Sequence, residues 1–380
     1  MKKKGGFRNI FLLGTSSLLN DIGSEAINPL VPFYLTALGG TGVAVGLMGG
    51  LREGLASLFK LLGGWLSDRV GKRKPFVFIG YLISTLFRFL VSIANSWPAV
   101  VSFLAVERFG KSRDAPRDVI ITQSTNHHGH GFGFHEAMDR TGAILGTLLA
   151  IFLFWKFNFE IKNIILIAAG ISLLSVIPIF FVKEKKTKPL RKNIFKGIKD
   201  LNAKLKYFIF VTFIFALGNF GLYLFLLLRV KEISGNIIIP LVIYAIFNLF
   251  YAVFSVPFGN LSDKIGRKKV LFIGYILFFF LSLSFIFVNS ILPLGILFIV
   301  YGLVYAITQS NQKAFVSDLS GKMKGTAIGF YYSVTGIAAI VGGLIAGILW
   351  DVNHLFLFGY TSVIALVSVL LLIFVKSKKI

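Results

Sequence analysis

Residues 63–74, with the sequence GGWLSDRVGKRK, form a short and densely charged stretch between two long apolar runs. Residues 259–269, GNLSDKIGRKK, repeat this stretch almost position for position, 195 residues further along the chain. A charged motif that occurs once in each half indicates an internal duplication, so we expect the chain to consist of two related halves. These two stretches are called the charged turns below.

The composition is that of a membrane protein. Of the 380 residues, 56% are hydrophobic, and the mean hydropathy is +0.80. Soluble domains are usually about 45–50% apolar. The longest apolar runs extend over about 20 residues, which is enough to cross a hydrocarbon layer of about 30 Å. The chain has no cysteine, which excludes disulfides and thiol chemistry.

Twelve apolar runs are predicted to be membrane helices. They cover residues 8–37, 42–67, 75–95, 98–123, 131–155 and 163–182, and then 207–229, 237–260, 270–289, 291–316, 325–350 and 354–376. We therefore expect an all-α membrane protein with bundles of six helices at 1–182 and 207–380, joined by a hydrophilic linker at 183–206. The end of this linker, 194–206, is predicted to form an amphipathic surface helix.

The first span is predicted to be a retained membrane helix. Residues 1–4 are basic, as in a signal peptide. However, Asn20 and Asp21 interrupt the apolar run, and no small-residue cleavage site follows before Pro29.

The distribution of basic residues predicts the orientation of the chain in the membrane. The formal net charge is +24, which in a soluble protein could indicate nucleic-acid binding. Here 27 of the 40 Lys and Arg residues lie in the two tails and in the loops on the same side as those tails. Because cytoplasmic loops are enriched in Lys and Arg, both termini are predicted to be cytoplasmic, and no nucleic-acid partner is expected.

The charged turns resemble the signature loop between helices 2 and 3 of transporters of the major facilitator superfamily. A second repeat supports two related halves, since residues 129–134, GHGFGF, match residues 325–330, GTAIGF. The resemblance implies parallel bundles around a central cavity, with the substrate near the membrane midplane. Residues 116–118 and 131–139 also look like a group of prokaryotic permeases in this superfamily.

The resemblance assigns a gating role to the charged turns. Asp68 is expected to face the positive N-terminus of the span that begins near residue 324, and Asp263 that of the span near residue 131. The basic residues of the first turn would either only set the orientation or pair with Asp118 to close a cytoplasmic gate. The candidate gate residues are Gly64, Asp68, Arg69, Gly71, Arg73 and Asp118, and in the second half Gly259, Asp263, Gly266 and Arg267.

Two acidic residues of the first span form a candidate coupling site. Asp21 and Glu25 are four positions apart and therefore share a helical face. Because two nearby carboxylates repel each other, the pair would readily hold a proton or a cation. Alternatively, each carboxylate pairs with a basic residue of the second or fourth span.

The fourth span is the most charged of the twelve. Its candidate site residues are Glu107, Arg108, Lys111 and Arg113. Fourth helices of the superfamily line the cavity, so Arg108 or Lys111 is expected to set the proton affinity of a nearby acid. The alternative is a buried network of ion pairs that fixes the register of the helices.

The fifth span carries further candidates. His135 and Asp139 lie on one stripe with Gly142 and Gly146, which resembles the antiporter motif of fifth helices in the superfamily. His135 titrates near physiological pH and is a candidate proton relay. The neighbouring histidines, residues 127, 128 and 130, lack a placed acid or thiol, so a metal site is not expected.

The second half offers polar residues without charge. Asn219, Gln309 and Gln312 are predicted to provide hydrogen bonds inside the cavity, beside tyrosines of the seventh and tenth spans. The alternative is that they only hold helices together. No phosphate-binding loop, zinc-protease motif or placed nucleophile is found, so neither an enzyme nor a cofactor is expected.

The predicted function is secondary transport of a small solute by alternating access, by a monomer in a prokaryotic cytoplasmic membrane. The charged turns resemble the drug/proton antiporter branch, which favours proton-coupled export. Proton-coupled uptake of an anionic solute or a metal chelate is the alternative, because the fourth span is cationic. An alternative of another class is a membrane sensor or scaffold that transports nothing.

Overall fold

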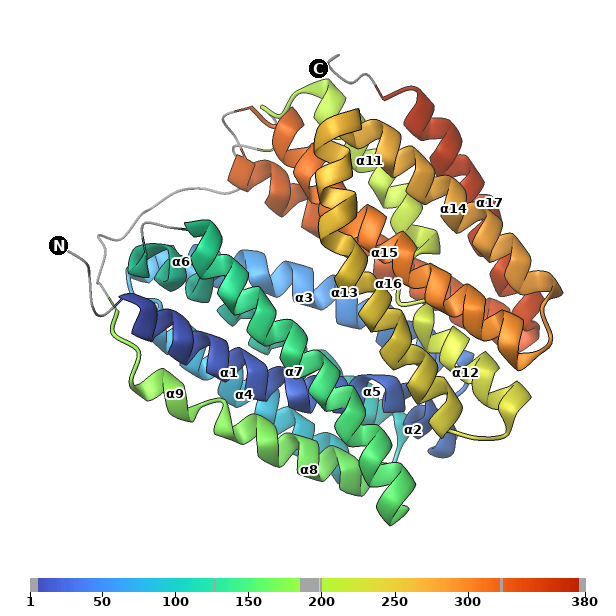
Figure 1. Cartoon of the computed structure of the whole chain (residues 1–380), viewed down its shortest axis with the longest axis horizontal. Coiled ribbons are helices and arrows are strands. Elements are labelled where there is room, and N and C mark those ends of the chain that lie inside the picture. Colours follow the sequence, from blue (N-terminus) through green and yellow to red (C-terminus); the bar gives the residue numbers. More distant parts are fainter. Residues whose placement is uncertain (1–5, 126–127, 185–197, 199, 322–323, 376–380) are drawn as a thin grey trace. The chain divides into compact units, whose positions relative to one another are not determined.

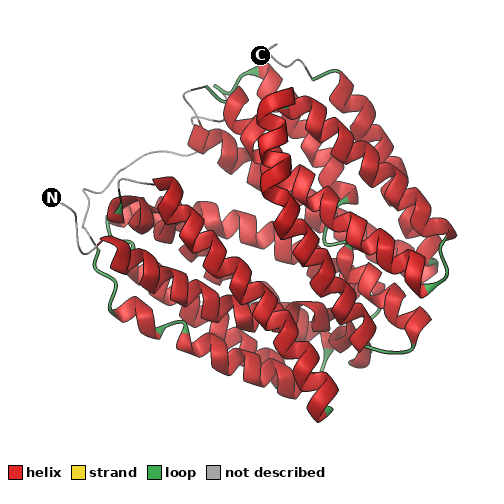
Figure 2. Ribbon diagram, viewed as in Figure 1, coloured by secondary structure: helices red, strands yellow, loops and turns green. Residues whose placement is uncertain are grey.

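The computed structural model describes residues 6–125, 128–184, 198, 200–321 and 324–375, which are helical apart from turns and short loops (Figure 2). The first half contains α1 (Gly6–Ile27), η1 (Asn28–Leu30), α2 (Val31–Ala37), α3 (Gly42–Val70), α4 (Lys74–Ser92), α5 (Trp97–Glu107), η2 (Arg108–Arg113), α6 (Asp114–Ser124), α7 (His128–Phe157), α8 (Ile161–Leu174) and α9 (Ile177–Phe180). The second half contains α11 (Ala203–Gly218), α12 (Tyr223–Ser234), α13 (Ile238–Ile265), α14 (Arg267–Phe287), α15 (Ile291–Leu319), α16 (Lys324–Val352) and α17 (His354–Ile373).

The twelve predicted spans are confirmed, and their ends agree with the observed ends within a few residues. Among the described residues, nine helical stretches are long and apolar enough to cross a membrane. The stretches at 6–37, 42–70 and 97–124 fall outside this group because they are interrupted or carry charged side chains within the span. Residues 194–197 and 199 of the predicted linker helix at 194–206 lie outside the described residues, and its last four residues begin α11.

Four of the spans are interrupted, the sixth span by a turn at residues 175–176 between α8 and α9. Pro29 and Pro32 end α1 in the 3₁₀ turn η1, as expected for residues that cannot donate a helical hydrogen bond. The fourth span changes to the 3₁₀ segment η2, which the sequence did not predict. The seventh span is broken at residues 219–222, between α11 and α12. Mid-helix 3₁₀ segments often mark functional hinges.

The chain forms two compact units, whose helices are labelled in Figure 1. The first unit comprises Met1–Gly39 and Leu55–Lys192, and the second comprises Gly40–Gly54 and Asn193–Ile380. The helix α3 therefore belongs to both units, because its beginning packs with the second half of the sequence. The predicted bundle boundaries at 182 and 207 remain a prediction.

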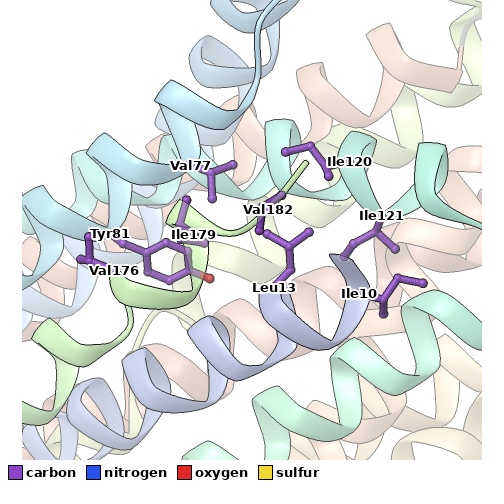
Figure 3. Packing of buried hydrophobic residues seen from close by; sticks show 9 residues of the cluster. All are labelled: Ile10, Leu13, Val77, Tyr81, Ile120, Ile121, Val176, Ile179 and Val182. Atoms are coloured by element: carbon purple, nitrogen blue, oxygen red, sulfur yellow. The ribbon is translucent and has the colours of Figure 1, made fainter. Parts of the chain in front are cut away.

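An apolar cluster forms part of the core of the first unit (Figure 3). It consists of Ile10, Leu13, Val77, Tyr81, Ile120, Ile121, Val176, Ile179 and Val182. These residues come from α1, α4, α6, α9 and the segment that follows α9. Tyr81 has no exposed surface, and its hydroxyl forms a hydrogen bond with one of the polar groups described below.

Equivalent helices of the two halves pack in the same way. A Cβ atom on Gly146 of α7 would lie 2.3 Å from the carbonyl oxygen of Ile22 in α1. A Cβ atom on Gly342 of α16 would lie 2.2 Å from the carbonyl oxygen of Leu217 in α11. Gly342 lies 196 positions after Gly146, and Leu217 lies 195 positions after Ile22, so the two contacts are equivalent in the repeat. The duplication therefore extends to helix packing.

Glycines also bring α3 and α16 into backbone contact within the second unit. Cβ atoms built on Gly46 and Gly50 would lie 2.0 and 2.5 Å from carbonyl oxygens of α16, those of Gly343 and Ala339. A Cβ atom on Gly54 would likewise lie 2.7 Å from the Gly336 carbonyl oxygen. Small residues at four-residue spacing let membrane helices approach closely, and this contact is called the α3–α16 seam.

We expect Gly46→Ala to lower the melting temperature of the purified protein. In an open helix position, alanine is favoured over glycine by about 1 kcal/mol. At Gly46 the added methyl group would force α3 and α16 apart. Gly170→Ala in α8 is the matched control, since no atom of the described residues lies within 4 Å of its Cβ position. An equal or higher melting temperature for Gly46→Ala would show that the seam is not tightly packed.

Candidate functional site

The first unit buries a triad of ion-paired side chains. Glu107, which is 1% exposed, lies 2.8 Å from Nη2 of Arg88 and 2.6 Å from Nη2 of Arg108. Arg88 also donates hydrogen bonds to Asn20 of α1 and to Ser172 of α8. The triad therefore links α1, α4, α5 and α8. This geometry fits the ion-pair network that the sequence offered as an alternative for Glu107 and Arg108, and their coupling role remains a prediction.

A second group of charges surrounds Asp114 at the start of α6. Its carboxylate lies 3.3 Å from Lys60 Nζ, 3.6 Å from Arg117 Nη1 and 3.9 Å from Arg113 Nε. Arg113 is 1% exposed and lies over the ring of Tyr81, with its guanidinium carbon 4.3 Å from the ring centre. The group therefore has an excess of positive charge.

Asp21 and Asp139 are brought together from facing helices. A Cβ atom on Gly142 of α7 would lie 3.2 Å from the Asp21 Cβ atom, and Asp139 lies one helical turn before Gly142. Lys111 and Arg117 also act electrostatically on the Asp139 carboxylate. Asp139 Oδ1 is buried and accepts no hydrogen bond from the described residues.

The predicted Asp21–Glu25 pair has separate partners in the structure. Asp21 accepts a hydrogen bond from the Asn20 amide at 2.9 Å, and Glu25 accepts one from the Asn28 amide at 2.5 Å. Glu25 thus interacts at the interruption of the first span, whereas Asp21 lies beside Asp139. A shared proton on Asp21 and Glu25 remains a prediction.

His135 belongs to a chain of hydrogen bonds. Its Nε2 lies 3.0 Å from Ser17 Oγ, and its Nδ1 lies 3.5 Å from Asp139 Oδ2. Ser17 Oγ also lies 2.8 Å from the Tyr81 hydroxyl and accepts a hydrogen bond from Arg117 at 3.2 Å. His135 therefore connects the Asp139 carboxylate to α1, α4 and α6.

The second unit contains a neutral counterpart of this chain. Gln312 donates a hydrogen bond of 2.9 Å to the Tyr275 hydroxyl and accepts one of 2.8 Å from Tyr331. At the repeat spacing of 194 to 196 positions, Tyr275, Gln312 and Tyr331 correspond to Tyr81, Arg117 and His135. The tyrosine occurs in both halves, whereas the arginine and histidine of its hydrogen-bonded chain occur only in the first.

The other polar candidates of the second half lie among aromatic side chains. Asn219, at the break between α11 and α12, accepts a hydrogen bond from the Tyr301 hydroxyl. The neighbouring rings in contact are those of Tyr223, Tyr244, Phe247, Tyr251, Tyr301 and Tyr305. Gln309 is half-buried on α15. Solute binding by Asn219, Gln309 and Gln312 remains a prediction.

The two charged turns are built alike. Asp68 pairs with Arg73 at 3.0 Å, and Asp263 pairs with Arg267 at 2.8 Å. Each turn contains a glycine with positive φ, Gly71 at 74° and Gly266 at 97°, a conformation that other residues rarely adopt. The pattern of charges in the sequence thus reflects one ion pair that closes each turn.

The remaining gate candidates have the following contacts. Gly64 packs against Ala115 of α6, as expected for close packing, whereas Gly259 has open space among the described residues. Arg69 lies over the ring of Trp65. Asp118 pairs with Arg117 at 3.1 Å, and the predicted pairing of Asp118 with Arg73 remains a prediction.

Two acidic residues at helix starts were missed in the sequence. Glu184 accepts hydrogen bonds from the backbone N–H groups of Arg73 and Lys74, at the start of α4. Asp351 accepts hydrogen bonds from the backbone N–H groups at the start of α3. Neither is recognisable from spacing, because each meets a helix more than 100 positions away. Among the described residues no group of acids or histidines could hold a metal ion, and His127 lies outside them.

The protein is a helical membrane protein that buries ionisable side chains and repeats one charged turn in each half. This is the architecture of a secondary transporter. The chain belongs to the Major Facilitator Superfamily, whose sequence profile matches residues 13–242 and 208–379. This is a family of transporters of small solutes and not of enzymes. The expected fold class is thereby confirmed.

Similar proteins cover nearly the whole chain. An uncharacterized MFS-type transporter of Methanocaldococcus jannaschii is 46% identical over 378 residues, covering 97% of this chain and 95% of the relative. The multidrug resistance protein MdtH of Photorhabdus laumondii is 24% identical over 356 residues, covering 90% and 87%. A variant of the nucleoside transporter NupG superposes with a TM-score of 0.82 at 15% identity, over 96% of this chain and 99% of that one. At this identity the superposition shows the fold alone.

We expect Glu107→Gln to destabilise the protein strongly. Removing one partner of a buried ion pair typically costs about 3–5 kcal/mol, because the remaining charges stay buried. Here two arginines would lose their common carboxylate. Glu160→Gln is the matched control, since its pair with Lys162 is exposed and contributes little. Thermal unfolding in detergent measures both variants, and similar melting temperatures for the two would contradict the structural role of the triad.

Proposed function

We propose that the protein is a proton-coupled exporter of a small amphipathic solute and that Asp21 and Asp139 form the coupling site. The observation that supports this most directly is the facing of these two carboxylates across α1 and α7, with Asp139 Oδ1 lacking a hydrogen-bond donor among the described residues. Two carboxylates close to each other inside a membrane favour the binding of one proton or one cation. This assignment replaces Glu25 by Asp139 as the partner of Asp21.

Basic residues beside the pair make proton release possible in this proposal. Arg117 and Lys111 act on the Asp139 carboxylate, and Arg117 is itself held by Asp114 and Asp118. A cation that moves toward the pair stabilises the ionised form, and a cation that moves away favours protonation. A change in helix position during alternating access would therefore change the proton affinity of the pair.

The direction of transport is proposed from similarity. MdtH is described as a multidrug resistance protein, and its sequence aligns with 90% of this chain. Export of an amphipathic solute against a proton flux is consistent with that relationship. We propose the cytoplasmic membrane of a prokaryote as the location, with both termini cytoplasmic and the monomer as the functional form.

Proton-coupled uptake of an anionic solute is the second candidate. It is favoured by the basic residues around Asp114, namely Lys60, Arg113 and Arg117. A solute carboxylate or phosphate, or a metal chelate of negative charge, would pair with this excess of positive charge. A thermal-shift screen of cationic and anionic solutes separates the two candidates, since a ligand that binds the folded state raises its apparent stability.

Asp139→Asn and Asp21→Asn are expected to uncouple transport. In liposomes, both variants should exchange solute across the membrane at rates close to wild type, and both should lose most of the acceleration by a pH gradient. Glu136→Gln is the control, because this carboxylate is exposed and pairs with Arg140. A gradient-dependent rate of Asp139→Asn equal to that of the wild type would remove the pair from the coupling mechanism.

Asp68→Asn is expected to slow transport several-fold while leaving the orientation in the membrane unchanged. The variant keeps the basic residues that orient the chain and loses the carboxylate that pairs with Arg73. Orientation is measured by labelling a single cysteine added at the C-terminus, since the chain has no cysteine of its own. Asp200→Asn, at an exposed acid, is the control. If Asp68→Asn transports at the wild-type rate, the first charged turn serves only as an orientation signal.

A further inference from the structure

Asp351 joins the end of α16 to the beginning of α3. Its carboxylate accepts hydrogen bonds from the backbone N–H groups of Gly42 at 2.5 Å and of Val43 at 3.1 Å. The first turn of a helix has N–H groups without helical partners and carries a partial positive charge, so a carboxylate stabilises it. Asp351 is thus an N-terminal cap that is supplied by another helix, 309 positions away.

The surrounding residues allow this approach only because position 42 is glycine. A Cβ atom on Gly42 would lie 2.6 Å from Trp350 Cδ1 and 2.8 Å from Asp351 Oδ1. Either distance is too short for a real side chain. Below the cap, the α3–α16 seam continues with glycines that face backbone atoms. The cap therefore closes one end of a seam that has few interlocking side chains.

The helix α3 also belongs to two units that a transport cycle must move. Residues 42–54 pack with the second unit, whereas residues 55–70 pack with the first. In alternating access the halves of a transporter change their relative position. A continuous helix cannot keep both sets of contacts during such a change unless it bends. If α3 moves as one rigid helix, one of its two sets of contacts has to open.

The cap on the N-terminus of α3 occurs in only one of the two repeats. At the repeat spacing of 195 positions, Lys156 and Ile237 take the places of Asp351 and Gly42. A lysine ammonium has no acceptor for backbone N–H groups. The cap therefore belongs to one of the two repeats, and it does not follow from the repeated fold itself.

We propose that Asp351 is a positioning residue of the transport cycle: its carboxylate keeps α3 on α16 in the conformation of this structure, and its release from the α3 N-terminus accompanies opening of the seam. The inference rests on alternating access and not on the proposed proton coupling.

Single-cysteine labelling tests this role, because the chain has no cysteine. The reporter is Ile340→Cys, since the Ile340 side chain lies 2.7 Å from the Cβ position of Gly54 in the seam. The matched control is Ile364→Cys on α17, whose side chain lies 2.9 Å from the Cβ position of Gly218 in α11. N-ethylmaleimide is added to native membranes that contain the full chain.

Asp351→Ala is expected to raise the labelling rate of Cys introduced at 340 by about fivefold, the typical effect of losing a helix cap. The rate for Cys introduced at 364 should not change. Gly42→Ala should act like Asp351→Ala, because the methyl group displaces the carboxylate. Asp351→Asn should label more slowly than Asp351→Ala, since its single amide oxygen still accepts one of the two hydrogen bonds, which use separate carboxylate oxygens in Asp351.

Two results would overturn the proposal. Unchanged labelling at position 340 in both Asp351→Ala and Gly42→Ala would show that the cap does not hold the seam. An equal increase at positions 340 and 364 would show a general loosening of the second unit instead of seam opening. Neither result depends on protons or on the solute, so a failure here is distinguishable from a failure of the proposed coupling site.

Discussion

The Glu107 carboxylate is the centre of the buried charge in the first unit. Inside a membrane bundle an ionised side chain is stable only beside partners of opposite charge. Glu107 meets this condition with two arginines, and one of them, Arg88, continues to α1 and α8. Four helices are thereby held in one register. Because these helices are fixed, the neighbouring acids Asp21 and Asp139 can be held at defined positions, which a coupling site requires.

The two halves share their packing and differ in their chemistry. The close contact of α7 with α1 is reproduced by α16 with α11, and in each charged turn the aspartate pairs with an arginine beside a glycine of positive φ. The hydrogen-bonded tyrosine is also common to both. In one half the tyrosine bonds to a serine that also contacts an arginine and a histidine, and in the other it bonds to a glutamine that also contacts a second tyrosine. Charge is therefore concentrated in the half where the proposed coupling site lies, and the second half keeps an aromatic and neutral interior.

The sequence was informative wherever a signal is local. Long apolar runs predicted the spans, and the charged turns predicted the repeat and the family. Contacts between distant residues were not predictable in the same way. The proximity of Asp21 to Asp139 depends on how α1 lies on α7, and Glu184 and Asp351 cap helices that are far away along the chain. The glycines of α3 at four-residue spacing were a readable signal of close packing, but the helix that they face was not.

Sharing α3 between two units has a consequence for biosynthesis. The first residues of this helix emerge early from the ribosome, whereas their partners on α16 are among the last to be made. Until then, the glycine face of α3 has only lipid or a temporary neighbour beside it. The N-terminal half therefore cannot reach its final packing as an independent module, and the last quarter of the chain completes a helix pair that was begun near its start. Long-range contacts of this kind slow folding, because the intervening chain has to be closed into a loop first.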